Sequence, residues 1–140
     1  MPTRKASAVW TGGLKGGAGS FKGETGLGGS YSFGSRFESA SGSNPEELLA
    51  AAEAACYSMA LSGALEKNGT PPTKVETSAA CTVEKVDDKM TITRIALTVQ
   101  ATVPKIDKAT FERIANETKE GCPVSRALKA VDIQLQATLL

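Results

Sequence analysis

The feature that most constrains the fold is a long apolar segment with helix signals at both ends. Residues 44–47 (NPEE) supply a capping asparagine, a proline suited to the first helical position, and two glutamates that favour the positive end of the helix dipole. An Asn-Gly pair and two prolines predict that the helix ends near Lys67. Because residues 48–61 are apolar on most sides of a helix, we expect a central, buried helix.

Other segments alternate as strands do. Strands are predicted over residues 5–11, 30–38, 73–86, 89–103 and 131–138. The glycine-rich stretch between the first two predicts tight turns, and it lacks the spacing of a phosphate-binding loop. Two further helices are predicted, one capped by Asp107 and running to about Glu120, and one over residues 124–129. With no internal repeat or linker, the chain is expected to form one α+β domain over residues 1–140.

The composition excludes several classes of function. The chain has no histidine, which excludes Ser-His-Asp and Cys-His catalysis and histidine-containing metal sites. A net charge of +1 indicates no electrostatic footprint for nucleic acid or an acidic membrane. No apolar run is expected to span a bilayer, and the N-terminal residues lack the apolar region of a secretory signal. A cytoplasmic location is therefore expected.

Three cysteines, Cys56, Cys81 and Cys122, carry the remaining chemistry. No two are close in sequence, so CxxC motifs for zinc or dithiol exchange are excluded. An odd number in a cytoplasmic protein disfavours a structural disulfide framework. Either these thiols are buried and inert, or the fold brings a reactive pair together.

The three thiols differ in their surroundings. Cys81 lies within a strand, where core packing is expected, and for Cys56 core packing and chemistry both remain open. Cys122 precedes Pro123 at a helix start, where its sulfur is expected to meet unpaired N–H groups that lower a thiol pKa. Simple capping after Gly121 remains the alternative for Cys122.

Arg36 and Glu46 are two further candidates. Arg36 lies in a predicted strand shortly before the helix that carries Cys56. A guanidinium near a thiol stabilises the thiolate and can bind a peroxide oxygen, while Glu46 can hold the guanidinium through two parallel bonds. The alternative is a surface ion pair that contributes little.

Two segments resemble a known family. Residues 35–38 (SRFE) and 44–61 (NPEELLAAAEAACYSMAL), followed by residues 115–128 (ANETKEGCPVSRAL), are similar to the OsmC/Ohr family of osmotically inducible and organic hydroperoxide resistance proteins. The SRFE segment and the second cysteine motif favour the OsmC branch. The likeness extends from Trp10 to the last predicted strand. The fold that this resemblance implies is an intertwined homodimer, with two β-sheets around central helices and two active sites at the subunit interface.

The resemblance also implies a function and a division of roles. Cys56 is implied to attack an organic hydroperoxide and become a sulfenic acid, which Cys122 resolves as a disulfide. Arg36 is implied to be the catalytic arginine and Glu46 the residue that holds it. An external dithiol, protein-bound dihydrolipoamide, is implied to reduce the disulfide. No metal, flavin or haem is implied, and no nucleic acid or membrane partner is expected.

Two residues do not fit this scheme. Glu53 lies one helical turn before Cys56, where a carboxylate raises a thiol pKa, so we expect it to point elsewhere or to have its own cation. Cys81 has no implied role, although it is a possible competing disulfide partner. Alternative functions are a redox sensor and a non-catalytic stress-protective binding protein on the same scaffold. The presence of all four candidate residues favours the peroxidase.

Overall fold

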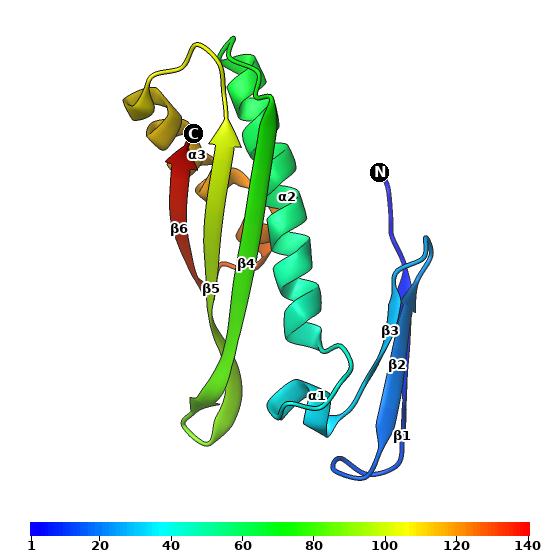
Figure 1. The fold of residues 1–140 in the computed structure, drawn as a ribbon. Helices are drawn as coiled ribbons and strands as arrows, with labels where there is room; N and C mark the ends of the chain where they lie inside the picture. Colours follow the sequence, from blue (N-terminus) through cyan, green and yellow to red (C-terminus); the bar gives the residue numbers. More distant parts are fainter. The chain divides into compact units, whose positions relative to one another are not determined.

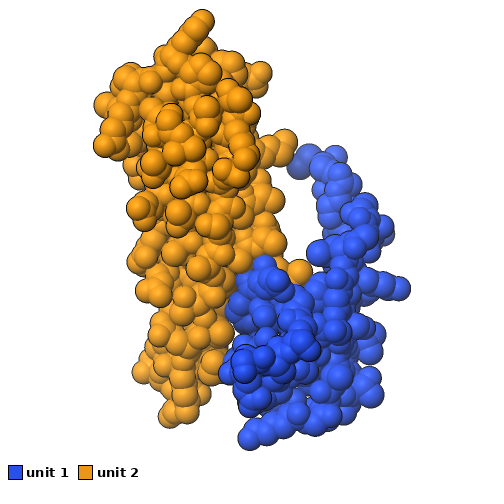
Figure 2. Space-filling view, in the orientation of Figure 1, with its two compact units in different colours: residues 1–47 blue, residues 48–140 orange.

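The computed structural model describes all 140 residues, which form two compact units, Met1–Glu47 and Leu48–Leu140 (Figures 1 and 2). Each unit contains one three-stranded sheet, and helices make up much of the rest of the chain. The predicted α+β class with two sheets is confirmed. That residues 1–140 fold as one domain stays a prediction.

The first unit contains an antiparallel sheet of β1 (Ala6–Thr11), β2 (Ala18–Gly23) and β3 (Gly28–Tyr31). The expected glycine turns are present, with φ of 90° at Gly12 and 92° at Gly26, in the region that favours glycine. Gly19 has a packing role, since a Cβ there would lie 2.6 Å from the Tyr31 ring. Its absence lets the rings of Trp10 and Tyr31 pack with centroids 5.3 Å apart.

The predicted strand over residues 30–38 is wrong in its second part, where helix α1 (Phe33–Phe37) forms instead. The Ser35 N–H donates to the Ser32 hydroxyl, and the Ser32 N–H donates to the Ser35 hydroxyl. This reciprocal capping pair stabilises the helix start and outweighs the strand-like alternation. Arg36 therefore lies on a helix.

Helix α2 (Pro45–Lys67) begins and ends where the sequence predicts. The Glu47 N–H donates to the Asn44 side chain at 2.8 Å, and Gly69 follows the helix with φ of 81°. The expectation of a helix buried on most sides is wrong, because Met59 is 81% exposed. Exposed residues recur every four positions and define the α2 apolar face: Ala51, Ala55, Met59 and Gly63.

By length and composition α2 is also apolar enough to cross a membrane, contrary to the expectation that no segment is. Core helices of soluble proteins meet the same criterion. Here Tyr57, Leu61 and Leu65 of α2 belong to the core of the second unit, and Glu53 is a fully buried carboxyl on the same helix. These side chains give α2 a packing role within the unit.

The second sheet has the order β4-β5-β6, formed by β4 (Lys74–Val86), β5 (Lys89–Thr102) and β6 (Asp132–Leu139). The two strands predicted over residues 73–86 and 89–103 are confirmed as β4 and β5, which pair antiparallel, and β6 pairs parallel to β5. Asp87 and Asp88 make the turn with φ of 48° and 62°, a region that aspartate tolerates.

Helices α3 (Lys108–Gly121) and α4 (Pro123–Ala127) complete the second unit. Asp107 caps α3 as predicted, accepting from the Thr110 N–H at 2.9 Å. The fully buried residues of β5 occupy alternate positions and so share one face of the sheet: Ile95, Leu97, Val99 and Ala101. Tyr57 of α2 and Phe111 of α3 join this cluster, so both helices pack on that face (Figure 1). This packing brings α2 and α3 together. It also brings together Cys56, in the middle of α2, and Cys122, which directly follows α3.

Candidate active site

Cys56 lies in the middle of α2 on a firmly packed turn. Its side chain is half-buried, whereas Glu53 and Tyr57 on either side of it are fully buried. The Tyr57 hydroxyl donates to the Ala115 carbonyl of α3 at 2.9 Å, which joins the two helices. The thiol of Cys56 is therefore fixed on a rigid element and keeps partial access to solvent.

Cys122 lies at the junction of α3 and α4 and is 1% exposed. Its N–H donates to the Thr118 carbonyl at 2.9 Å, which ends α3, and Pro123 opens α4. The sulfurs of Cys122 and Cys56 lie 2.6 Å apart and share a hydrogen bond, although 66 positions separate them. Both thiols are free, and the separation is close to the roughly 2.05 Å of a disulfide bond. A disulfide can therefore form with little movement.

The expected interaction of Cys122 with the start of α4 is wrong. Cys122 is the N-terminal capping residue, but its side chain makes no capping hydrogen bond. The Val124 N–H in the first turn of α4 bonds instead to Cys56. Because α4 packs beside α2, an N–H group in the first turn of α4, which has no partner within its own helix, bonds to the Cys56 thiol of α2.

The surroundings of Cys56 in the second unit favour its neutral thiol. Burial raises the pKa of Cys56 most, and the hydrogen bond with Cys122 raises it further. The Val124 N–H lowers this pKa, while Cys122 and Glu53 also raise it electrostatically. No cation is among the groups of the second unit that shift this pKa.

Of the two alternatives expected for Glu53, a cation of its own is wrong. Its carboxyl is 0% exposed, and Oε1 accepts a hydrogen bond from the Ser125 hydroxyl of α4. Oε2 is buried without a hydrogen-bond partner, and no salt bridge involves Glu53. Its charge raises the pKa of Cys56, after the larger effect of burial. The carboxyl is therefore held by Ser125 of α4 and has no cation of its own.

Arg36 and Glu46 form an ion pair within the first unit. Arg36 Nη2 donates to Glu46 Oε1 at 2.8 Å, and Arg36 Nε donates to the two carboxylate oxygens at 3.1 and 3.3 Å. The Glu46 side chain is only 7% exposed, against 36% for Arg36, and the guanidinium lies 5.0 Å from the centre of the Phe37 ring. The alternative of a simple surface pair is therefore wrong, since Glu46 fixes the orientation of the guanidinium from a buried position.

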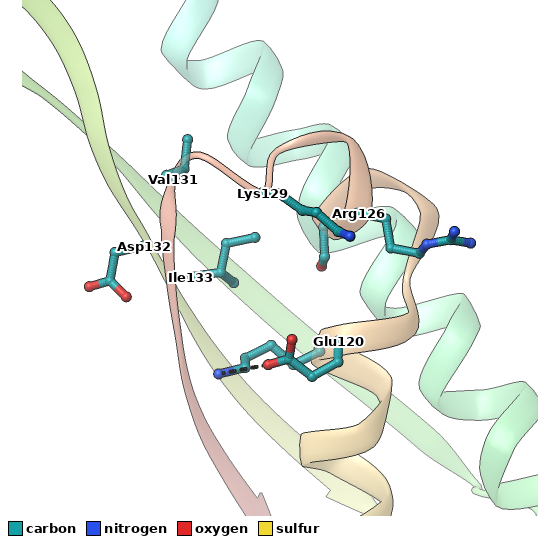
Figure 3. A pocket seen from close by; sticks show the side chains of 8 residues that line it. Glu120, Arg126, Lys129, Val131, Asp132 and Ile133 are labelled. Carbon is teal, nitrogen blue, oxygen red and sulfur yellow. Dashed lines mark ion pairs between the residues drawn. The ribbon is translucent and has the colours of Figure 1, made fainter.

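Two other features of the second unit are Cys81 and a pocket whose lining includes Ser125. Cys81 is half-buried in β4 and packs against the core, as predicted. A pocket of about 250 Å³ lies between α4, β6 and the end of α3 (Figure 3). Its lining mixes charges of both signs, and Lys119 and Glu120 in its wall pair at 3.4 Å.

Comparison with known proteins identifies the family. A model of OsmC-like proteins matches residues 38–136. The chain belongs to the OsmC family. It is 45% identical to the peroxiredoxin OsmC of Escherichia coli K12, over 96% of this chain and 97% of that protein. It is 30% identical to the organic hydroperoxide resistance protein OhrB of Bacillus subtilis, over 71% of this chain and 72% of that protein.

Solved structures in this family show the same fold. The OsmC-like protein of Mycoplasma pneumoniae matches with a TM-score of 0.76 at 14% identity, covering 99% of this chain and 98% of that one. The OhrB structure from Bacillus subtilis matches with a TM-score of 0.71 at 23% identity, covering 96% and 98%. The predicted OsmC-like fold is therefore confirmed.

Sequence reasoning did not single out Ser125, Tyr57 or Val124, which all contact the thiols or their neighbours. Ser125 and Val124 lie within the GCPVS motif, and Tyr57 directly follows Cys56. These positions were visible in the motifs, but their partners are 58 to 72 positions away and only the packing of α2 against α3 and α4 reveals them.

Proposed function

We propose that this protein is a cysteine-based peroxidase that reduces organic hydroperoxides to alcohols. The observation that carries the proposal is the position of a half-buried Cys56 thiol 2.6 Å from the buried Cys122 thiol. A peroxide reaches the more accessible sulfur first, and the buried one is already in place to react next. The family and its 45% identical peroxiredoxin relative support the same chemistry.

The reaction proceeds in two steps. The Cys56 thiolate attacks the terminal oxygen of a hydroperoxide, the O–O bond breaks, and the alkoxide takes a proton and leaves as an alcohol. Cys56 is now a sulfenic acid. The Cys122 sulfur attacks the oxidised sulfur, the S–S bond forms, and the hydroxyl leaves as water with the thiol proton. An external dithiol then reduces the disulfide by exchange.

Arg36 is proposed to favour the thiolate and to bind the peroxide oxygen. A positive charge near Cys56 is needed to form the thiolate, because burial, Cys122 and Glu53 all raise the pKa of Cys56. Glu46 engages Arg36 through Nε and Nη2, and Nη1 makes no hydrogen bond within the chain. The guanidinium is thus oriented and still has a donor to offer.

We also propose that the active protein is a homodimer. The α2 apolar face supports this, since its small residues permit close approach of a second helix and Met59 exposes 81% of its surface. Met59→Glu is expected to convert dimers to monomers in analytical ultracentrifugation. Glu66→Gln, an exposed change elsewhere on α2, is the control. A dimeric Met59→Glu protein would contradict this interface.

The physiological setting completes the proposal. We place the protein in the cytoplasm, where thiols are kept reduced, and propose protein-bound dihydrolipoamide as its reductant. Dihydrolipoamide is expected to sustain peroxide turnover where a thioredoxin system does not. The opposite preference would contradict the reductant and leave the peroxidase proposal intact.

The direct test measures consumption of cumene or tert-butyl hydroperoxide with dithiothreitol as reductant. Wild type is expected to consume the peroxide and Cys56→Ser to show no consumption above background. Cys81→Ser is the matched control and is expected to retain activity, since Cys81 packs against the core of the second unit in β4. Activity that survives Cys56→Ser would overturn the assignment.

A further inference from the structure

The hydrogen bond from Ser125 to Glu53 is one of three contacts that join the start of α4 to a single turn of α2. The other two are the contact of the Cys122 and Cys56 sulfurs and the bond from the Val124 N–H to Cys56. Both of those end on the Cys56 sulfur, which changes when a peroxide oxidises it. The Ser125–Glu53 bond involves neither sulfur, so oxidation of Cys56 does not change either of its atoms.

We infer that Glu53 and Ser125 are positioning residues for the resolving step, holding the segment with Cys122 against Cys56 while Cys56 is a sulfenic acid. The inference rests on the proposed function. In that step the Cys122 sulfur bonds to the Cys56 sulfur, the S–O bond breaks, and the hydroxyl leaves as water with the Cys122 proton. No other oxidant or reductant is needed.

The burial of Glu53 supports a positioning role over simple core packing. A fully buried carboxyl with an unpartnered Oε2 is unfavourable for stability, and an apolar side chain would fill the same space without that penalty. The charge also hinders the first step, because it opposes the Cys56 thiolate. The hydrogen bond and the charge of Glu53 therefore act on different steps, and separate substitutions distinguish them.

The groups around Cys56 allow this separation. Glu53 on its own helix and the Cys122 thiol at the α3–α4 junction both raise the pKa of Cys56, and the Val124 N–H of α4 lowers it. The Tyr57 hydroxyl donates to the Ala115 carbonyl and makes no hydrogen bond to Cys56. A change in the titration of Cys56 on removal of Glu53 therefore reports the charge of Glu53.

The experiment compares three variants. Ser125→Ala removes the hydrogen bond and keeps the charge, Glu53→Gln keeps an acceptor for Ser125 and removes the charge, and Glu53→Ala removes both. Each is treated with one equivalent of cumene hydroperoxide, quenched, and examined by peptide mass spectrometry for Cys56 sulfenic acid, sulfinic acid and the Cys56–Cys122 disulfide. The rate of Cys56 alkylation against pH gives the titration of the thiol. Ser58→Ala, which removes a 2.8 Å bond from α2 to Thr77, is the matched control.

We expect Ser125→Ala to form the disulfide about tenfold more slowly and to accumulate sulfinic acid, with the alkylation midpoint unmoved. Glu53→Gln is expected to resolve at the wild-type rate with its midpoint shifted to lower pH, and Glu53→Ala to show both effects. Ser125→Ala resolving as fast as Ser58→Ala would overturn the inference, as would Glu53→Gln resolving as slowly as Ser125→Ala. If wild-type Cys56 is not oxidised at all, the proposed function itself fails.

Discussion

The two units place opposite electrostatic surroundings around the candidate residues. In Leu48–Leu140, burial, a second thiol and a buried carboxyl raise the pKa of Cys56 and favour the neutral form. In Met1–Glu47, Arg36 forms a partly exposed ion pair with the buried Glu46. The second unit is thus suited to disulfide formation and is poorly suited to producing a thiolate. Under the proposed mechanism, activation by Arg36 and resolution by Cys122 therefore fall to separate parts of the sequence.

The largest effect is expected from breaking the thiol pair. Cys122→Ser is expected to stop peroxide consumption after about one equivalent, because the Cys56 sulfenic acid has no partner and proceeds to sulfinic acid. Intact-mass measurement should show one and then two added oxygen atoms on the protein. Rapid turnover with dithiothreitol, or a disulfide between Cys56 and Cys81, would show that Cys122 is not the resolving residue.

A smaller effect on activity is expected from removing the positive charge of Arg36. Arg36→Ala is expected to slow the peroxide step about 100-fold, as for loss of one preorganised donor. The midpoint of Cys56 alkylation should move to higher pH, because loss of a positive charge disfavours the thiolate. Single-turnover kinetics and alkylation against pH measure the two effects.

The chain offers a matched control for this substitution. Arg113 pairs with Glu117 at 3.0 Å on the surface of α3, with both side chains more than half exposed. Arg113→Ala should leave the peroxide step and the midpoint as in wild type, since exposed pairs contribute little. Equal rates for Arg36→Ala and Arg113→Ala would remove Arg36 from the mechanism.

A further prediction concerns how Glu46 supports Arg36. Glu46→Gln keeps one acceptor and loses the charge, so the guanidinium is held less firmly. We expect the peroxide step to slow about tenfold, less than in Arg36→Ala, with Arg36 still present to favour the thiolate. The same single-turnover assay checks this order. A larger loss in Glu46→Gln than in Arg36→Ala would mean that the carboxyl has its own role.

The smallest effect is expected from Tyr57→Phe, which tests the packing under the thiol pair. Loss of the hydroxyl leaves the buried Ala115 carbonyl without this partner, which should lower the free energy of unfolding by about 1–2 kcal/mol. Urea denaturation measures the change. The peroxide step should stay near the wild-type rate. A large loss of activity at unchanged stability would show that the Tyr57 hydroxyl takes part in the reaction.

The sequence by itself determined the local elements and the identities of the candidate residues. The Asn44-Pro45 start of α2, the Asp87-Asp88 turn and the cap of α3 by Asp107 all depend on neighbours within a few positions. Sequence alternation missed α1, because two serines at capping spacing favour a helix there. The two cysteine motifs indicated the family, since they are contiguous stretches of sequence.

Only the tertiary structure decided how the thiols are surrounded. The 2.6 Å contact of the two sulfurs, the bond of the Val124 N–H to Cys56 and the burial of Glu53 against Ser125 all join residues more than 60 positions apart. The physical reason is that burial and hydrogen-bond partners, which set a thiol pKa, depend on how α2, α3 and α4 pack on one sheet face. No local pattern carries that information.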